Sequence, residues 1–178
     1  DKLRRLMNLA QFLQSHALSL FHLSSPDLVF GFDGDPATRN VVGLIGKAPE
    51  RAVDGVTLRK IGQEIIACLG GKRVHPAWLV PGGVNESLSE QHLQKIQQSI
   101  PQAKEIVLRT VEWFAELADQ YPDEREHFGT FPSMFTSLVS GQGTWEHYNS
   151  PLCFTDTEGS IVADGVAHRD YAAYIAEA

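Results

Sequence analysis

Cysteine is scarce in this 178-residue chain: Cys68 and Cys153 are the two present. Two thiols define no disulfide framework, and there is no CxxC pair to begin a cysteine-based zinc or iron–sulfur site. Basic residues are also few, since 15 Lys+Arg stand against 22 Asp+Glu and give a net charge of −7. This balance argues against nucleic-acid binding through phosphate neutralisation, and no polybasic cluster favours an anionic membrane surface.

Long apolar runs and common cofactor motifs are missing as well. No stretch approaches the ~20 apolar residues that cross a bilayer, and no signal peptide is evident, so we expect a reducing, cytoplasmic location. The phosphate-loop pattern fails because Lys47 is followed by Ala48, and Gly141-x-Gly143 lacks the third glycine of a dinucleotide fingerprint. None of the seven histidines forms an i, i+4 pair, so each is first interpreted as a structural residue.

What is present predicts a mainly helical α+β fold. Leucines and alanines recur every three or four residues from Leu3 to Leu20, which predicts a helix that Pro26 ends. Helices are also expected from Asp35-Pro36 to about Gly46, over Thr57–Leu69 before Gly70-Gly71, from Ser87 or Ser89 onward with a possible interruption at Pro101, and over Gln102–Gln120 up to Pro122. Short segments separated by glycine-containing turns predict a small antiparallel sheet in the C-terminal third.

Residues 70–84 form an irregular Gly- and Pro-rich loop that is unusually apolar. Such a loop is expected to pack against something, and another chain is one candidate. The sequence also begins at Asp1 with a helical pattern and ends with one. We therefore expect residues 1–178 to be a single domain that is an internal fragment of a larger one.

Three stretches together resemble the large, catalytic subunit of nickel–iron hydrogenases, most closely the cytoplasmic, bidirectional, NAD-reducing group. The first helix carries a "SHALxFFHLxxPD"-like segment, followed by "GQEII…GG…HP" and "W-x-VPGGV" segments. They lie at residues 15–27, 62–76 and 78–84. Ser15 and Ser19 replace an Asp and a His that membrane-bound relatives usually carry, so roles of those two positions do not transfer.

The resemblance implies a parent protein that oxidises H2 reversibly at a nickel–iron centre, with electrons passing through a small subunit's iron–sulfur cluster towards NAD. The implied partners are a hydrogenase small subunit together with an NAD-linked diaphorase. In the family, two CxxC motifs near the two ends of the large subunit hold the metals, and neither lies in this sequence. The fragment is therefore expected to be inactive alone, with no catalytic residue and no metal ligand of its own.

The resemblance nevertheless points to seven site residues. His75 matches a position near the partner's cluster, where an imidazole would raise the cluster potential by hydrogen bonding. An equally weighted interpretation is that His75 only satisfies backbone carbonyls of its own loop. His16 and His22 lie on a helix beside the active-site cavity, with helix–helix hydrogen bonding as the simpler interpretation. Partner contact is expected from the loop after His75. The loop residues are Trp78, Pro81, Gly82 and Gly83.

Two other residues invite a function but favour a plainer interpretation. Glu64 would make a proton carrier, yet Arg59 and Lys60 nearby favour a paired surface acid. Cys68 is expected to be a helix core residue.

Two alternatives remain beside the hydrogenase interpretation. One is a metal-free scaffold like the quinone-site subunit of respiratory complex I, and the other is a non-catalytic helical interaction domain. A deazaflavin-coupled hydrogenase differs only in its electron acceptor.

Overall fold

The computed structural model describes residues 1–176 and divides the chain into two compact units. Unit 1 is Asp1–Arg125 and unit 2 is Glu126–Ala178. The expectation of one domain over residues 1–178 stays a prediction.

Unit 1 begins with a helix that continues past the predicted stop at Pro26. Helix α1 (Lys2–Ala17) runs into a π-helical segment, η1 (Leu18–Ser24), and then into α2 (Ser25–Phe30). Pro26 lies in the first turn of α2, where its missing N–H is tolerated. The Ser25 hydroxyl donates to the carbonyl of Leu20 at 2.7 Å within the widened turn. The helix ends instead at Gly31, whose φ is 87°.

The next two helices differ from the prediction at their starts. Helix α3 (Val41–Lys47) is capped by Asn40, whose side-chain oxygen accepts from the N–H groups of Val42 and Gly43 at 2.9 and 3.1 Å. Asp35, where this helix was predicted to begin, instead closes a turn by accepting from Ala37 N–H. Helix α4 (Pro49–Gly70) begins earlier than predicted and ends as predicted, at left-handed Gly71.

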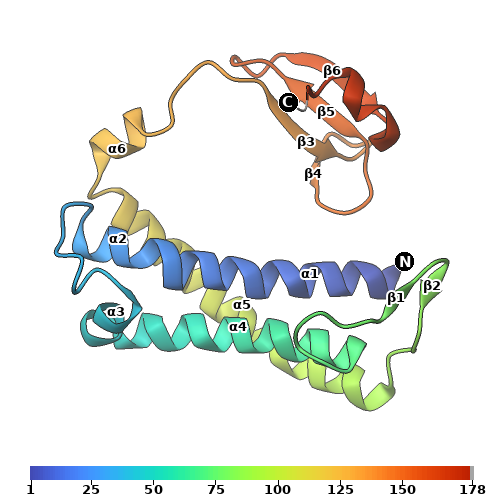
Figure 1. The fold of residues 1–178 in the computed structure, drawn as a ribbon, viewed down its shortest axis with the longest axis horizontal. Helices are drawn as coiled ribbons and strands as arrows, with labels where there is room; N and C mark the ends of the chain where they lie inside the picture. Colours follow the sequence, from blue (N-terminus) through green and yellow to red (C-terminus); the bar gives the residue numbers. More distant parts are fainter. Residues whose placement is uncertain (177–178) are drawn as a thin grey trace. The chain divides into compact units, whose positions relative to one another are not determined.

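Helices α1 and α4 lie side by side and antiparallel, as Figure 1 shows. Two glycines of α4 allow α1 and η1 to approach this helix closely. A Cβ at Gly62 would lie 2.8 Å from the Cβ of Gln14, and one at Gly55 would lie 2.5 Å from the Cβ of Phe21. The buried core then lies between α1, η1, α4 and α5. Its members are Ala10, Ala17, Phe21, Leu58, Ile61, Ile65, Ile66, Leu69, Trp78, Ile96, Ala103 and Ile106.

The long helix α5 (Glu90–Ala118) completes the bundle by packing on α4. Its cap is Ser89, which accepts from His92 N–H at 3.2 Å, and Pro101 lies inside the helix without ending it. Trp113 of α5 stacks on Phe21 of η1, with ring centroids 6.2 Å apart. A two-stranded hairpin, β1 (Leu79–Val80) with β2 (Gly83–Val84), precedes α5, and α6 (Pro122–His127) follows it.

Unit 2 is a four-stranded antiparallel sheet in the order β4-β3-β5-β6. Its core is small and includes Cys153, Phe154 and Val166, with the Tyr174 ring stacked on Phe154. The unit ends in a short 3-10 helix, η2. The elements are β3 (Phe135–Val139), β4 (Trp145–Glu146), β5 (Leu152–Thr155), β6 (Ile161–Val166) and η2 (His168–Ala173).

The predicted fold class is confirmed: the chain is mainly α, with a small antiparallel sheet in its C-terminal part. Within residues 1–176, no helix is both long enough and apolar enough to cross a bilayer.

Candidate functional site

The loop between α4 and α5 is held in one shape by buried contacts. Gly70 approaches Pro76 so closely that a Cβ there would lie 2.4 Å from the proline Cβ. Trp78 is 3% exposed and donates its indole N–H to the carbonyl of Glu86 at 3.1 Å. Asn85 returns two bonds, from its N–H to Trp78 and from its amide nitrogen to Ala77. An irregular loop with these anchors presents a preformed surface.

Arg4 fixes this loop from the other end of the sequence. Its Nη2 donates to the carbonyls of Val80 and Gly83, both at 2.8 Å, and its Nε lies 3.3 Å from the same Gly83 oxygen. The β1–β2 hairpin therefore lies beside the first turns of α1 (Figure 1). Sequence reasoning missed Arg4, because no local pattern connects residues separated by 76 to 79 positions.

The loop places the predicted partner-contact residues in two different settings. Pro81 and Gly82 are exposed at the hairpin turn, where Gly82 has a φ of 84°, and Gly83 is half-buried. Trp78, in contrast, lies in the core of unit 1 and supports the loop from inside. The predicted contact of these four residues with another chain stays a prediction.

His75 is exposed and has a φ of 48°, the left-handed backbone conformation that a non-glycine residue seldom adopts. The next residue, Pro76, packs closely against Gly70. This contact fixes the chain directly after His75 and so holds His75 in its left-handed conformation. The imidazole is thereby carried at the surface of the loop. Its predicted role towards a cluster stays a prediction.

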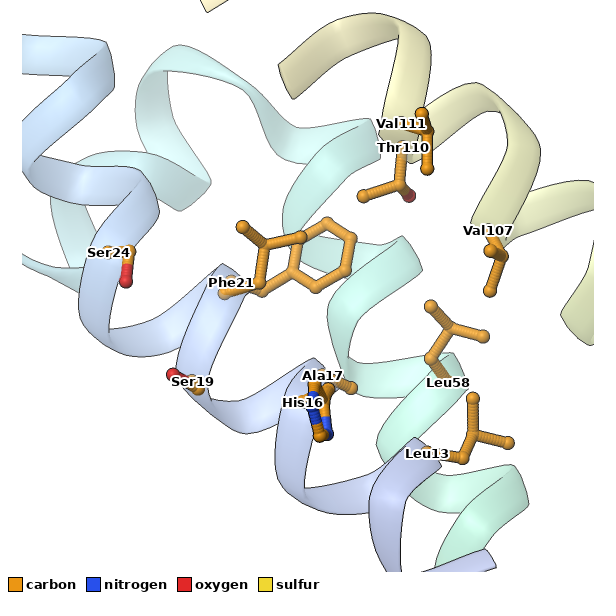
Figure 2. Close-up of a pocket in the computed structure, with 11 residues that line it drawn as sticks. Leu13, His16, Ala17, Ser19, Phe21, Ser24, Leu58, Val107, Thr110 and Val111 are labelled. Atoms are coloured by element: carbon orange, nitrogen blue, oxygen red, sulfur yellow. The ribbon is translucent and has the colours of Figure 1, made fainter. Parts of the chain in front are cut away.

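An apolar cavity of about 480 Å³ opens between α1, η1, α4 and α5. Figure 2 shows Leu58 of α4 drawn between Leu13 of α1 and Val107 of α5, with the side chains of η1 towards the left of the view. Thr110 and Val111 of α5 lie at its upper right. His16 reaches this cavity, and its Nδ1 lies 2.9 Å from the carbonyl of Phe12, which can only accept. Nδ1 is therefore the protonated nitrogen, and the bond is made within α1 rather than between helices.

His22, on η1, has a buried Nδ1 with no hydrogen-bond partner in the described part of the chain. It does not line the same cavity as His16. The structure therefore does not bring the three predicted histidines together into one site. Roles for His16 and His22 in proton movement stay predictions.

A charged cluster on α4 and α5 was not predicted. Asp54 is 5% exposed and accepts from Arg109 Nε at 2.9 Å and from Arg109 Nη2 at 2.5 Å. Arg51 lies 3.6 Å from the same carboxylate and over the ring of Trp113. The hydrogen bonds to Asp54 raise the pKa of Arg109 above its usual value, so this guanidinium stays charged. The cluster joins the two helices through one buried carboxylate.

Glu64 is a paired acid, as the plainer interpretation expected. Its carboxylate lies 3.9 Å from Lys60 and 3.5 Å from Lys95. Cys68 packs against the core of unit 1, and burial, with Asp164 nearby, raises the pKa of the Cys153 thiol. In residues 1–176, no three His, Cys, Asp or Glu side chains are grouped so as to hold a metal ion.

The chain is similar in sequence to subunits of known hydrogenases. The A subunit of the F420-non-reducing hydrogenase vhu of Methanocaldococcus jannaschii is 35% identical over 176 residues, which is 99% of this chain and 42% of that protein. The beta subunit of the NAD-reducing hydrogenase HoxS of Cupriavidus necator is 34% identical over 188 residues, which is 100% of this chain and 38% of that protein. The chain is similar to hydrogenase subunits along its whole length. No protein-family model matches the sequence.

A solved structure gives the same relationship. The chain matches an NAD+-reducing [NiFe]-hydrogenase in the H2-reduced state with a TM-score of 0.90 and 36% identity, over 96% of this chain and 38% of that one. The chain spans about two fifths of the length of these hydrogenase subunits.

These matches correct the large-subunit prediction. The relatives are named as A or beta subunits, and the one from Archaeoglobus profundus is named an iron-sulfur subunit. We therefore replace the assignment to a nickel–iron large subunit by similarity to hydrogenase subunits of this A or beta kind. A nickel–iron centre held by this chain has no support in its described residues.

Proposed function

We propose that this chain is a segment of a longer hydrogenase subunit, and that it serves as a scaffold within a cytoplasmic complex that oxidises H2 reversibly. The observation that supports the proposal is identity of 34–35% to hydrogenase subunits over almost the entire chain, together with a TM-score of 0.90. H2 and protons are the substrates of the complex.

The proposed electron acceptor is NAD+, reached through iron–sulfur clusters and an NAD-linked diaphorase in other subunits. One relative is named an NAD-reducing hydrogenase, and so is the solved structure. Among residues 1–176 no three His, Cys, Asp or Glu side chains are grouped to hold a metal ion, and we assign this chain the role of holding helices and a docking loop in place.

The docking surface proposed for a neighbouring subunit is the loop of residues 70–84. Its support is the combination of rigidity and exposure: Trp78 and Arg4 anchor the loop, while His75, Pro81 and Gly82 remain at its surface. In this arrangement His75 faces the partner and donates a hydrogen bond towards its iron–sulfur cluster. The similarity of this chain to hydrogenase subunits favours a docking function within a hydrogenase over the two alternatives. These are a complex I-like quinone scaffold and a free interaction domain.

The test is H2-dependent electron transfer by the intact complex that contains this subunit. We expect H2 to reduce both benzyl viologen and NAD+, and deazaflavin coenzyme to stay oxidised. Deletion of residues 81–82 should abolish NAD+ reduction and release the neighbouring subunit on size-exclusion chromatography. A complex that reduces no acceptor with H2, but binds a quinone, would overturn the proposal in favour of the complex I-like alternative.

The fragment prediction has a direct test of its own. Sequencing the coding DNA on both sides of this segment should reveal an open frame that extends the subunit to about the length of its relatives. Stop codons at both borders would contradict it.

A further inference from the structure

The loop proposed as a docking surface has a charge opposite to that of the chain as a whole. From Ile65 to Asn85 there is no Asp or Glu, although the whole chain carries −7. Lys72 and Arg73 are both exposed in this segment, and His75 follows them. The nearest carboxylates along the chain are Glu64, already paired with two lysines, and Glu86.

Arg4 adds to this charge rather than removing it. Its guanidinium gives three contacts to backbone carbonyls of the hairpin, and within the described residues none of its bonds goes to a carboxylate. Carbonyl oxygens satisfy the donors but leave the positive charge uncompensated. Arg4 thus places a cation against the carbonyls of the β1–β2 hairpin.

The surface is apolar as well as basic. Val74 and Leu79 are each 58% exposed, on either side of the buried Trp78. Because Trp78, Asn85 and Arg4 fix the backbone of residues 77–86, binding to this part of the surface requires little further ordering of the loop. A rigid surface with two exposed aliphatic side chains and uncompensated positive charge is complementary to an acidic protein surface with a shallow apolar hollow.

We infer that the partner of this loop is an acidic surface of a neighbouring hydrogenase subunit, which Lys72, Arg73 and Arg4 attract while Val74 and Leu79 make the apolar contact. This inference rests on the proposed docking function and specifies the chemistry of the partner. An anionic membrane surface would share the attraction, but the acidic chain around the loop disfavours it.

The test compares single charge reversals in the full-length subunit, with the purified remaining subunits of the same complex as the binding probe. Arg73→Glu should weaken association by about ten- to thirty-fold at ~50 mM salt, and the loss should shrink at ~500 mM because salt screens the attraction. Lys104→Glu, an exposed reversal on α5, is the matched control and should change the dissociation constant by less than about twofold. Circular dichroism of both variants should match the parent, since both side chains are exposed.

A third variant separates the two levels of the proposal. Leu79→Ala removes an apolar contact without changing charge, and should weaken association equally at low and high salt. If Leu79→Ala weakens association while Arg73→Glu does not, the docking function stands and the acidic partner is overturned. If neither variant has an effect, the docking function itself fails. If Arg73→Glu instead abolishes binding to phosphatidylserine vesicles and leaves the association between subunits intact, the surface binds membrane and the inference is overturned.

Discussion

At the scale of single residues, Asp54 joins two helices through one buried carboxylate. Replacement by Asn keeps the size but removes the charge that Arg109 and Arg51 share. We expect Asp54→Asn to lower the free energy of unfolding by about 1–3 kcal/mol, because a buried charged hydrogen-bond acceptor is lost. Urea unfolding of the full chain, followed by circular dichroism, measures this difference.

Glu105→Gln is the control for that prediction, because it touches the same guanidinium from the surface. Its carboxylate lies 2.9 Å from Arg109 Nη1 and is 76% exposed. An exposed i, i+4 pair contributes about 0.3–0.5 kcal/mol, so Glu105→Gln should cost no more than that. Equal losses for the two variants would show that burial of Asp54 does not matter.

Cys153 gives a prediction about pH. Burial raises the pKa of its thiol, and Asp164 adds to the effect, so the folded chain retains this proton to higher pH than the unfolded chain does. Folded chain then binds more protons than unfolded chain above the ordinary thiol pKa of about 8.5. The stability contribution is therefore complete below about pH 8.5 and decreases as pH rises through the folded pKa.

Urea midpoints of unit 2 measured between pH 7 and pH 10 test this sign, with Cys153→Ala as the comparison. The parent should lose stability with rising pH more steeply than the variant does. Iodoacetamide should also modify Cys153 at least about ten times more slowly in folded than in unfolded chain. Identical pH slopes for parent and variant would contradict the assignment.

At the scale of elements, the antiparallel contact of α1 with α4 depends on a missing side chain. Gly62 lies where a Cβ would meet Gln14 and Ala10 at 2.8 and 2.9 Å, much of it backbone that cannot move aside. We expect Gly62→Ala to destabilise unit 1 by about 1–3 kcal/mol through overpacking, even though Ala is the better helix former. Thermal unfolding at the α-helical circular dichroism band measures it.

Gly46→Ala is the matched control in helix α3. Nothing lies within 4 Å of a Cβ built there, so only helix propensity changes, and the variant should be more stable by about 0.5–1 kcal/mol. Changes of opposite sign in the free energy of unfolding for Gly62→Ala and Gly46→Ala would separate the effect of packing from that of helix propensity. A Gly62→Ala variant that is more stable than the parent would contradict the prediction. It would show that α1 and α4 can move apart at this position without a loss of free energy of unfolding.

Some elements could be predicted from the residue types in the local sequence. These are the end of α4 at the left-handed Gly71, and the strands of unit 2 with their glycine-containing turns. Prediction from the local sequence failed at Pro26, because a π-helical segment let the proline fall in a new first turn. It also placed the start of α3 at Asp35, whereas Asn40 caps this helix, since both residue types serve as caps and only the turn between them decides.

The candidate site divides in the same way. Glycine and proline marked residues 70–84 as an irregular loop, and most of that loop is exposed in the structure. The contacts of Arg4 with the hairpin and of Asp54 with Arg109 were not predicted. The residues in each contact lie 55 to 79 positions apart, and no periodicity in the sequence connects them. Long-range polar contacts depend on the packed fold, and their residues look like ordinary surface charges in the sequence.

At the scale of the whole molecule, the two units differ in how much core each possesses. The core of unit 1 draws on four helical segments, whereas unit 2 has roughly fifty residues around a few buried side chains. A unit of that size buries only about 60% of its unfolded surface and is correspondingly marginal. We expect amide hydrogens of β5 to exchange at least about ten times faster than those in the middle of α4, because local opening of unit 2 requires less free energy.

Hydrogen exchange followed by mass spectrometry measures this in the full chain, with peptides covering residues 152–155 and 58–69. The same peptides from urea-unfolded chain supply the intrinsic rates, so the comparison reports protection rather than sequence. Rates that differ after this correction mean that unit 2 opens while unit 1 stays folded. A single common opening free energy for both peptides would instead mean that the units unfold together, and would support the prediction of one domain over residues 1–178.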